Sequence, residues 1–246
     1  MDFDFSDDQE SLRDAVRRWV DKGFSFERRH GIAKAGGRTR EVYAELAELG
    51  LTGLAVPEAH GGMGFGAIEA MLVCEELGRG LVNAPYAQGA LVAPVLLSAA
   101  PAEVQAAWLP KIADASALVV LAHQERAARY RLNHVTTKAT KAGNGYTLSG
   151  AKSVVPAGDE ADAFIVPART AGADGDAQGI ALFIVAKGAA GLAVRGYPTQ
   201  DGARAAELTL KDTPTTLIAT DALPVLEHAV DAGIAAVCAE GVGVMD

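Results

Sequence analysis

The sequence predicts a multi-domain α+β protein: an N-terminal helical bundle, a middle antiparallel β-sandwich or barrel, and the start of a C-terminal helical domain. Two changes of hydrophobic period predict this order. Apolar residues recur at helical spacing through the N-terminal part, and the spacing becomes that of strands near Ala117. The helical period returns after Pro224. We therefore expect domains over residues 1–117, 118–225 and 226–246.

The N-terminal part carries the start and stop signals of four helices. Ser6 and Gln9 form a capping-box pattern, because the Ser6 hydroxyl can accept from the Gln9 N–H while the Gln9 side chain reaches back. A second helix is expected from about Thr39 to Gly50, where glycine is a natural C-terminal stop. Two more are expected over 67–78 and 102–112. Their apolar faces need one another, which predicts a bundle.

The middle part reads as short strands separated by turn residues. The run 118–121 is apolar, 134–139 alternates, and Gly143-Asn144-Gly145 is typical of a hairpin turn. Further strands are expected over 163–166, 180–185, 192–197 and 205–210. No helical segment lies between them, so we expect an antiparallel sandwich or barrel rather than a parallel sheet.

Composition excludes several classes of function. The chain has 246 residues, half of them apolar, and a net charge of −9, which indicates a globular protein and argues against nucleic-acid or membrane binding. The apolar stretch 81–100 contains two prolines, so we expect a core helix rather than a membrane span. Cys74 and Cys238 have no metal or disulfide spacing, and the acidic start Met1–Asp4 is unlike a signal peptide. These features favour the cytoplasm.

Local motifs alone suggest no chemistry. The stretch 62–67 fits G-x-G-x-x-A, but the βαβ unit that a dinucleotide fold needs is absent around it, so we interpret it as a glycine-rich turn. Glu75 and Glu76 are adjacent, and neighbours on a helix point in different directions. The histidines lack metal-ligand spacing, so no metal site is expected.

Taken together, the segments resemble one known family. The stretches L-A-E-L-G-L-T-G-L-A-V-P-E-A-H-G-G-M-G, E-E-L-G-R, W-L-P-K-I and A-D-A-F-I-V-P-A-R are similar to the acyl-CoA dehydrogenase family, in family order. Two details, R-Y-R-L over 129–132 and G-Y-P-T-Q-D-G-A-R-A-A-E-L-T-L over 196–210, look most like the small subunits of pimeloyl-CoA dehydrogenases. Those subunits work beside a larger paralogous subunit.

The resemblance implies a reaction and its partners. A member of the family binds FAD against its middle β-domain and oxidises an acyl-CoA to the trans-2-enoyl-CoA, with electron-transfer flavoprotein as the electron acceptor. For this chain it implies a subunit of such an enzyme, with pimeloyl-CoA or another dicarboxylyl-CoA as a possible substrate. The alternative is a non-catalytic small subunit that binds no flavin and shapes the site of the larger subunit in a hetero-oligomer.

The resemblance also places candidate flavin residues on two strands. The first strand carries Leu121, His123 and Gln124, and the Gln124 amide stands where the family threonine bonds the flavin. The second carries Val154, where the family has a tryptophan, and Pro156, which has no N–H to donate. The two departures on the second strand favour the alternative that binds no flavin.

The candidate substrate residues follow the first strand. Tyr130 replaces the family serine that contacts the CoA arm. Arg126 and Arg129 could meet a CoA phosphate or a substrate carboxylate, since the arginine fork suits both. The competing interpretation is that both arginines are exposed and pair with Glu125 or with aspartates.

The last segment resembles the first helix of the family's C-terminal domain, which is expected to be truncated here. The family glutamate that acts as catalytic base then lies beyond Asp246, so the base remains unknown. In some members of the family the catalytic glutamate lies on this first helix. The corresponding position here is about Gly233, which is two residues from Asp231. The apolar residues of this helix, such as Val230 and Val237, are expected to form an association surface.

Overall fold

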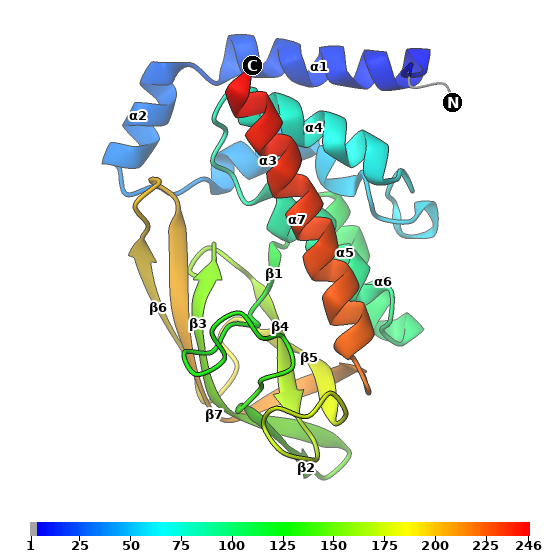
Figure 1. Cartoon of the computed structure of the whole chain (residues 1–246), viewed down its shortest axis with the longest axis vertical. Coiled ribbons are helices and arrows are strands. Elements are labelled where there is room, and N and C mark those ends of the chain that lie inside the picture. The colour runs from blue at the N-terminus through cyan, green and yellow to red at the C-terminus, as the bar shows by residue number, and fades with distance from the viewer. Residues whose placement is uncertain (1–3) are drawn as a thin grey trace.

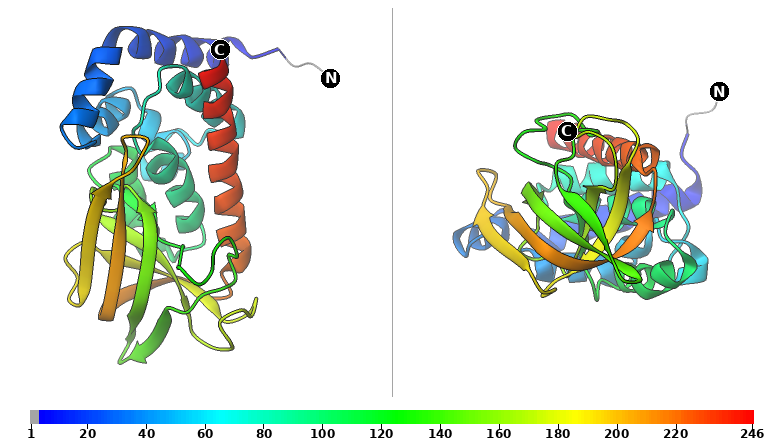
Figure 2. Two further views of the ribbon diagram at one scale, coloured as in Figure 1. Left: turned by 60° about the vertical axis from the view of Figure 1, so that its left-hand side comes forward. Right: turned by 90° about the horizontal axis from the view of Figure 1, so that it is seen from below.

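A computed structural model describes residues 4–246 (Figure 1). The helices gather at one end, the strands form a barrel at the other, and the last helix, α7, runs along both (Figures 1 and 2). This confirms the expected order of helical domain, β-domain and C-terminal helix. The exact boundaries of the three expected domains stay a prediction, and part of the acidic start Met1–Asp4 lies outside the described residues.

The N-terminal domain consists of helices whose start signals the sequence carries. Gln9 N–H donates to Ser6 Oγ at 3.2 Å and Ser6 N–H donates to Gln9 Oε1 at 3.0 Å, so the capping box is confirmed. Gly50 ends a helix in the left-handed region with a φ of 78°. The helices are α1 (Asp7–Gly23), α2 (Phe26–Lys34), α3 (Arg40–Glu48), α4 (Ala67–Arg79), α5 (Ala93–Leu97) and α6 (Ala102–Ala113), with short 3-10 turns η1 (Leu51–Gly53) and η2 (Glu58–His60).

Two features of this domain differ in detail from the sequence expectation. No apolar period predicts α2, because none of its residues is buried, although Ser25 caps its start by accepting from the Arg28 N–H. The apolar stretch 81–100 is helical only in its second half, where a π-helical turn η3 (Ala87–Val92) runs directly into α5. The glycine-rich stretch 62–67 is a turn, as expected. Position 62 requires glycine, because a Cβ there would lie 2.0 Å from the Val56 carbonyl oxygen.

The β-domain is a closed barrel with two extra strands. Its strands are β1 (Val119–Leu121), β2 (Lys138–Ala142), β3 (Gly145–Pro156), β4 (Ala163–Arg169), β5 (Ile180–Ala186), β6 (Leu192–Pro198) and β7 (Arg204–Ala219). The ring runs β4-β2-β3-β7-β5 and back to β4, while β1 pairs with β4 and β6 pairs with β7. The β2–β3 hairpin has the expected Gly143-Asn144-Gly145 turn.

The sheet is antiparallel, as expected, apart from two short parallel contacts. β1 pairs with β4 in parallel over three residues, and β2 meets β4 in parallel through the pair Lys138 and Arg169. Each of these pairs is joined by a long connection rather than by a tight turn, and such a connection allows the parallel direction. The sequence spacing shows strands and turns, but it does not show which distant strands become neighbours.

Helix α7 (Leu223–Met245) is packed tightly across α4. A Cβ at Gly78 would lie 2.1 Å from the Glu240 carbonyl oxygen, and one at Gly243 would lie 1.8 Å from that of Glu75. By length and composition alone α7 could cross a membrane, and 22% of its most apolar window is buried in this structure, Ala236, Ala239 and Gly243 being among its buried residues. Its larger apolar residues, among them Ile234 and Val237, are exposed on another face.

Candidate functional site

An apolar cleft of about 370 Å³ lies between α7 and the barrel, and we call it the α7 cleft. Helix α7 runs beside the barrel in both views of Figure 2. The walls come from η3, from the chain just after β1, from the end of β3 and from α7. The lining residues are Ala87, Gln88, Val92, Leu121, His123, Pro156, Ala229, Val230, Gly233, Ile234, Val237 and Cys238.

Only three of the lining residues are polar, and none carries a charge at neutral pH. These are Gln88, His123 and Cys238. Burial, together with the nearby charge of Lys152, lowers the pKa of His123 to about 4, so the imidazole is neutral at pH 7. The cleft therefore offers an apolar surface with a few weak hydrogen-bonding groups, and neither a carboxylate nor a cation lines it.

The structure brings three of the five candidate flavin residues into this cleft. Leu121, His123 and Pro156 line it, whereas Gln124 and Val154 are not among the lining residues. Gln124 still joins the two candidate strands, because its backbone carbonyl accepts from the Ser153 N–H at 2.9 Å. Val154 has a φ of 50° and an exposed side chain.

One of the two candidate strands fits a flavin ring, and the other does not. Among the described residues, the backbone N–H groups of His123 and Gln124 have no protein acceptor, so both can donate to a ligand. At the end of β3, Pro156 has no N–H, and the Ala157 N–H already donates to the Arg204 carbonyl at 2.8 Å. The first strand therefore offers two free donors, whereas neither Pro156 nor Ala157 offers one at the end of β3.

The candidate substrate residues lie outside the α7 cleft. Tyr130 is 96% exposed, and Arg129 is exposed with a φ of 54°. The Arg126 side chain is 82% exposed, and its nearest carboxylate, Glu207 rather than Glu125, is 3.7 Å away. The three residues belong to one loop between β1 and β2, and their roles stay a prediction.

A buried ion pair that the sequence did not indicate lies behind the cleft wall. Lys152 is fully buried, and its Nζ donates to Glu125 Oε1 at 2.7 Å. Glu125 also accepts from the N–H and hydroxyl groups of Thr136 and Thr137. These partners hold the pKa of Glu125 down to about 2 against the opposing effect of burial. The pair ties the chain after β1 to the start of β2 and to β3.

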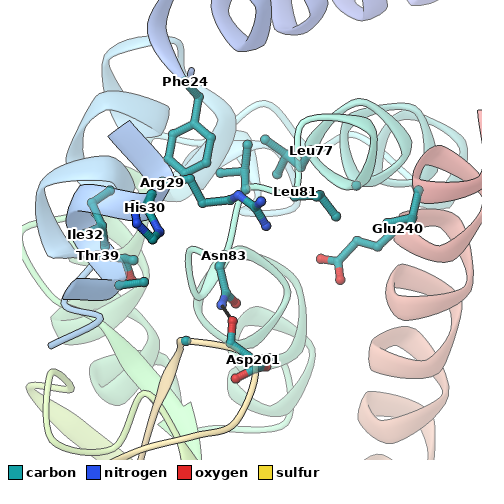
Figure 3. Close-up of a pocket in the computed structure, with 15 residues that line it drawn as sticks. Phe24, Arg29, His30, Ile32, Thr39, Leu77, Leu81, Asn83, Asp201 and Glu240 are labelled. Carbon is teal, nitrogen blue, oxygen red and sulfur yellow. Dashed lines mark hydrogen bonds between the residues drawn. The ribbon is translucent and has the colours of Figure 1, made fainter. Parts of the chain in front are cut away.

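A second pocket, which we call the charged pocket, lies near the C-terminal end of α7 (Figure 3). It has a volume of about 460 Å³. Arg29 and His30 of α2 lie on one side, and Glu240 of α7 and Asp201 of the β6–β7 turn lie on others. Burial raises the pKa of Glu240. No group of three or more metal-ligating side chains occurs anywhere in residues 4–246.

Comparison with protein-family models identifies the class to which this fold and cleft belong. Residues 6–116 match the acyl-CoA dehydrogenase N-terminal domain, and residues 120–213 match the acyl-CoA dehydrogenase middle domain. The two matches together cover most of the chain. The chain therefore belongs to the acyl-CoA dehydrogenase family of FAD-dependent oxidoreductases.

Individual relatives agree with this assignment. The chain is similar to the acyl-CoA dehydrogenase FadE12 of Mycobacterium tuberculosis, with 31% identity over 76% of this chain and 48% of the relative. It is also similar to isovaleryl-CoA dehydrogenase of Pongo abelii, with 31% identity over 76% and 45%. Benzylmalonyl-CoA dehydrogenase of Aromatoleum aromaticum is 28% identical over 79% and 51%. The chain thus spans about half the length of the curated relatives it matches.

Among solved structures, the chain is similar to the ChsE4–ChsE5 complex of Mycobacterium tuberculosis. The identity is 27%, the TM-score is 0.84, and the match covers 100% of this chain and 65% of the other. That structure is a complex of two differently named proteins. The likeness extends over helical domain, barrel and α7 together, so the arrangement that creates the α7 cleft is shared.

Proposed function

We propose that this chain is a subunit of an FAD-dependent acyl-CoA dehydrogenase and that the α7 cleft receives the acyl part of the thioester. The observation that carries the proposal is the cleft itself. It is apolar, it lies between α7 and the stretch after β1 in which the N–H groups of His123 and Gln124 have no protein acceptor, and it belongs to a chain of this family. Such clefts are the usual form of small-molecule sites.

The residues of the chain would serve binding and the exclusion of water. Aliphatic side chains from η3 and α7 would cover an acyl chain, and removal of water strengthens electrostatic interactions around a thioester. FAD, when bound, would accept the hydride in the family reaction. Because only one of the two candidate strands fits a flavin, we assign no further step to this chain through that group.

No lining residue is a carboxylate, the group that removes the α-proton in the family reaction. Gly233, which corresponds to the glutamate of some family members, lines the cleft without a functional side chain. Asp231 is exposed and is not among the lining residues. A base would have to come from outside the cleft lining described here.

This supports a second candidate function, a non-catalytic subunit that shapes the cleft of a larger homologous subunit. A cleft without a carboxylate and a β3 end without a free N–H are the observations that favour it. In either case we propose a hetero- or homo-oligomer in the cytoplasm, with electron-transfer flavoprotein as the electron acceptor of the assembly.

The resemblance to pimeloyl-CoA dehydrogenase small subunits suggested a dicarboxylyl substrate. The names of two relatives show that family membership leaves this open, since benzylmalonyl-CoA carries a second carboxylate and isovaleryl-CoA does not. The arginines on which the expectation depended lie outside the cleft lining. We therefore carry forward acyl-CoA as the class of substrate.

The purified chain decides between the two candidates. A subunit that binds FAD should be yellow after addition and removal of excess FAD, and it should oxidise acyl-CoA with an artificial electron acceptor once its base is supplied. A non-catalytic subunit should remain colourless and bind acyl-CoA without turnover. A chain that binds neither FAD nor acyl-CoA, alone or with a larger homologue, would contradict both candidates.

A further inference from the structure

We infer that the α7 cleft selects an uncharged acyl tail and rejects a tail that ends in a second carboxylate. The inference rests on the proposed function, because it assumes that the tail enters this cleft. It commits the chain to one class of substrate, the CoA thioesters of monocarboxylic acids.

The lining of the α7 cleft carries no charge at neutral pH. Nine of the twelve lining residues are aliphatic, proline or glycine, and the other three are Gln88, His123 and Cys238. A carboxylate that leaves water is tolerated only where a cation or several donors receive it. His123 is neutral at pH 7, because burial lowers its pKa to about 4. It therefore cannot act as that cation.

Three cations follow or adjoin the strands that carry the lining residues, and none of them is available in the cleft. The charge of Lys152 helps to lower the pKa of His123. Lys152 itself is fully buried, and its Nζ already donates to Glu125 Oε1 at 2.7 Å. Arg126 and Arg129 lie on the exposed loop after β1 and do not line the cleft. Among the residues that the structure describes, no lysine or arginine lines the cleft, where it could receive a distal carboxylate.

The cleft is also large enough for an acyl tail. The cleft has a volume of about 370 Å³, whereas an apolar cavity of roughly 150 Å³ holds a benzene ring in another protein. A medium-length tail therefore fits. Each added methylene that is buried should tighten binding about fourfold.

The test compares octanoyl-CoA with suberyl-CoA, which have tails of equal length and differ in the distal carboxylate. Isothermal titration calorimetry of the full chain at pH 7 should give at least about tenfold tighter binding of octanoyl-CoA. Affinity should also rise from acetyl-CoA to octanoyl-CoA by about fourfold per methylene. Equal affinity for the two ligands, or tighter binding of suberyl-CoA, would overturn the inference and leave acyl-CoA binding intact. Failure of every thioester to bind would instead overturn the proposed function.

Two lysine variants of α7 test whether the cleft itself causes the preference for an uncharged tail. Val237 lines the cleft and is 60% exposed, so Val237→Lys adds a cation at its edge with little risk to the fold. It should bring the affinity for suberyl-CoA close to that for octanoyl-CoA. Val242→Lys adds the same charge on the same helix at a residue that is 46% exposed and lines neither pocket, and it should keep the wild-type ratio. Equal effects of the two variants would show that general attraction, not the cleft, sets the preference.

Discussion

The α7 cleft and the charged pocket share one helix but differ in whether charged residues line them. The cleft is lined by the middle of α7 and contains no charged group at neutral pH, whereas the charged pocket is lined by Glu240 and Val244 near the end of the same helix. Arg29 and Asp201 give the charged pocket cationic and anionic sides (Figure 3). One helix therefore lines one pocket that contains charged side chains and one that does not.

This difference indicates which of the two pockets suits the acyl chain of the proposed substrate. An acyl chain gains free energy from the removal of apolar surface from water, and the cleft offers that surface. The charged pocket is as large, but its ionisable groups lose hydration when an apolar ligand covers them. Chemical character rather than size distinguishes the two as acyl sites.

The largest expected effect comes from breaking the ion pair behind the cleft wall. Glu125→Ala leaves Lys152 buried without its partner, and removal of one member of such a pair costs about 3–5 kcal/mol. Urea unfolding monitored by circular dichroism measures the loss. Arg126→Ala is the control, because its pair with Glu207 is exposed and long, and we expect a change of about 1 kcal/mol or less. Equal losses in the two variants would mean that the buried pair stabilises nothing beyond a surface contact.

The next effect breaks the helix crossing that holds both pockets together. Gly243→Ala places a Cβ 1.8 Å from the Glu75 carbonyl oxygen, so α4 and α7 must move apart, at a cost of about 1–3 kcal/mol or more. Gly241→Ala meets no atom within 4 Å and should be neutral or slightly stabilising, because alanine is the better helix former. The thermal unfolding midpoints of the two variants test this. A wild-type midpoint for Gly243→Ala would show that the crossing is looser than described.

The ion pair also predicts a dependence of stability on pH. The folded state holds the pKa of Glu125 down to about 2, so its contribution is fully present above the ordinary carboxyl range and is lost as pH falls toward 2. The free energy of unfolding should therefore drop more steeply between pH 5 and pH 3 in the wild type than in Glu125→Gln. Urea titrations at both pH values supply the comparison, and parallel curves would exclude this role.

The smallest expected effect concerns the reactivity of the two cysteine thiols, one in the α7 cleft and one outside it. Cys238 is exposed and lines the α7 cleft, whereas Cys74 is buried and its pKa is raised by burial. A disulfide reagent should modify Cys238 within minutes and Cys74 only after unfolding. Octanoyl-CoA should slow modification of Cys238, and the Cys238→Ser variant identifies the fast thiol. Unchanged modification in saturating octanoyl-CoA would place the ligand elsewhere.

Much of the fold could be predicted because local signals agree with it. The capping box of Ser6 and Gln9 marks the start of α1, and Gly50 marks the end of α3. Gly143-Asn144-Gly145 marks the turn between β2 and β3. Helix α2 could not be found, since no residue in it is buried. The parallel contacts of β4 were also missed, because strand neighbours depend on long connections and not on the period of one strand.

The candidate site was predictable only in part. Resemblance selected Leu121, His123 and Pro156, which line one wall of the cleft, but the opposite wall from η3 and α7 has the sequence pattern of ordinary apolar helix. The partners Glu125 and Lys152 are distant in sequence and have no motif that connects them. Exposure decided against Arg126, Arg129 and Tyr130 as part of the cleft, and exposure of a loop is set by tertiary packing.

Photo-crosslinking tests the central claim most directly, namely that the acyl tail lies in the α7 cleft. An octanoyl-CoA analogue with a diazirine at the end of the tail is bound to the full chain and irradiated, and the modified peptides are identified by mass spectrometry. The account predicts labels within 87–92 and 229–238, and excess unlabelled octanoyl-CoA should remove them. Labels confined to the charged pocket, at Phe24 or Ile32 of its apolar side, would contradict the account.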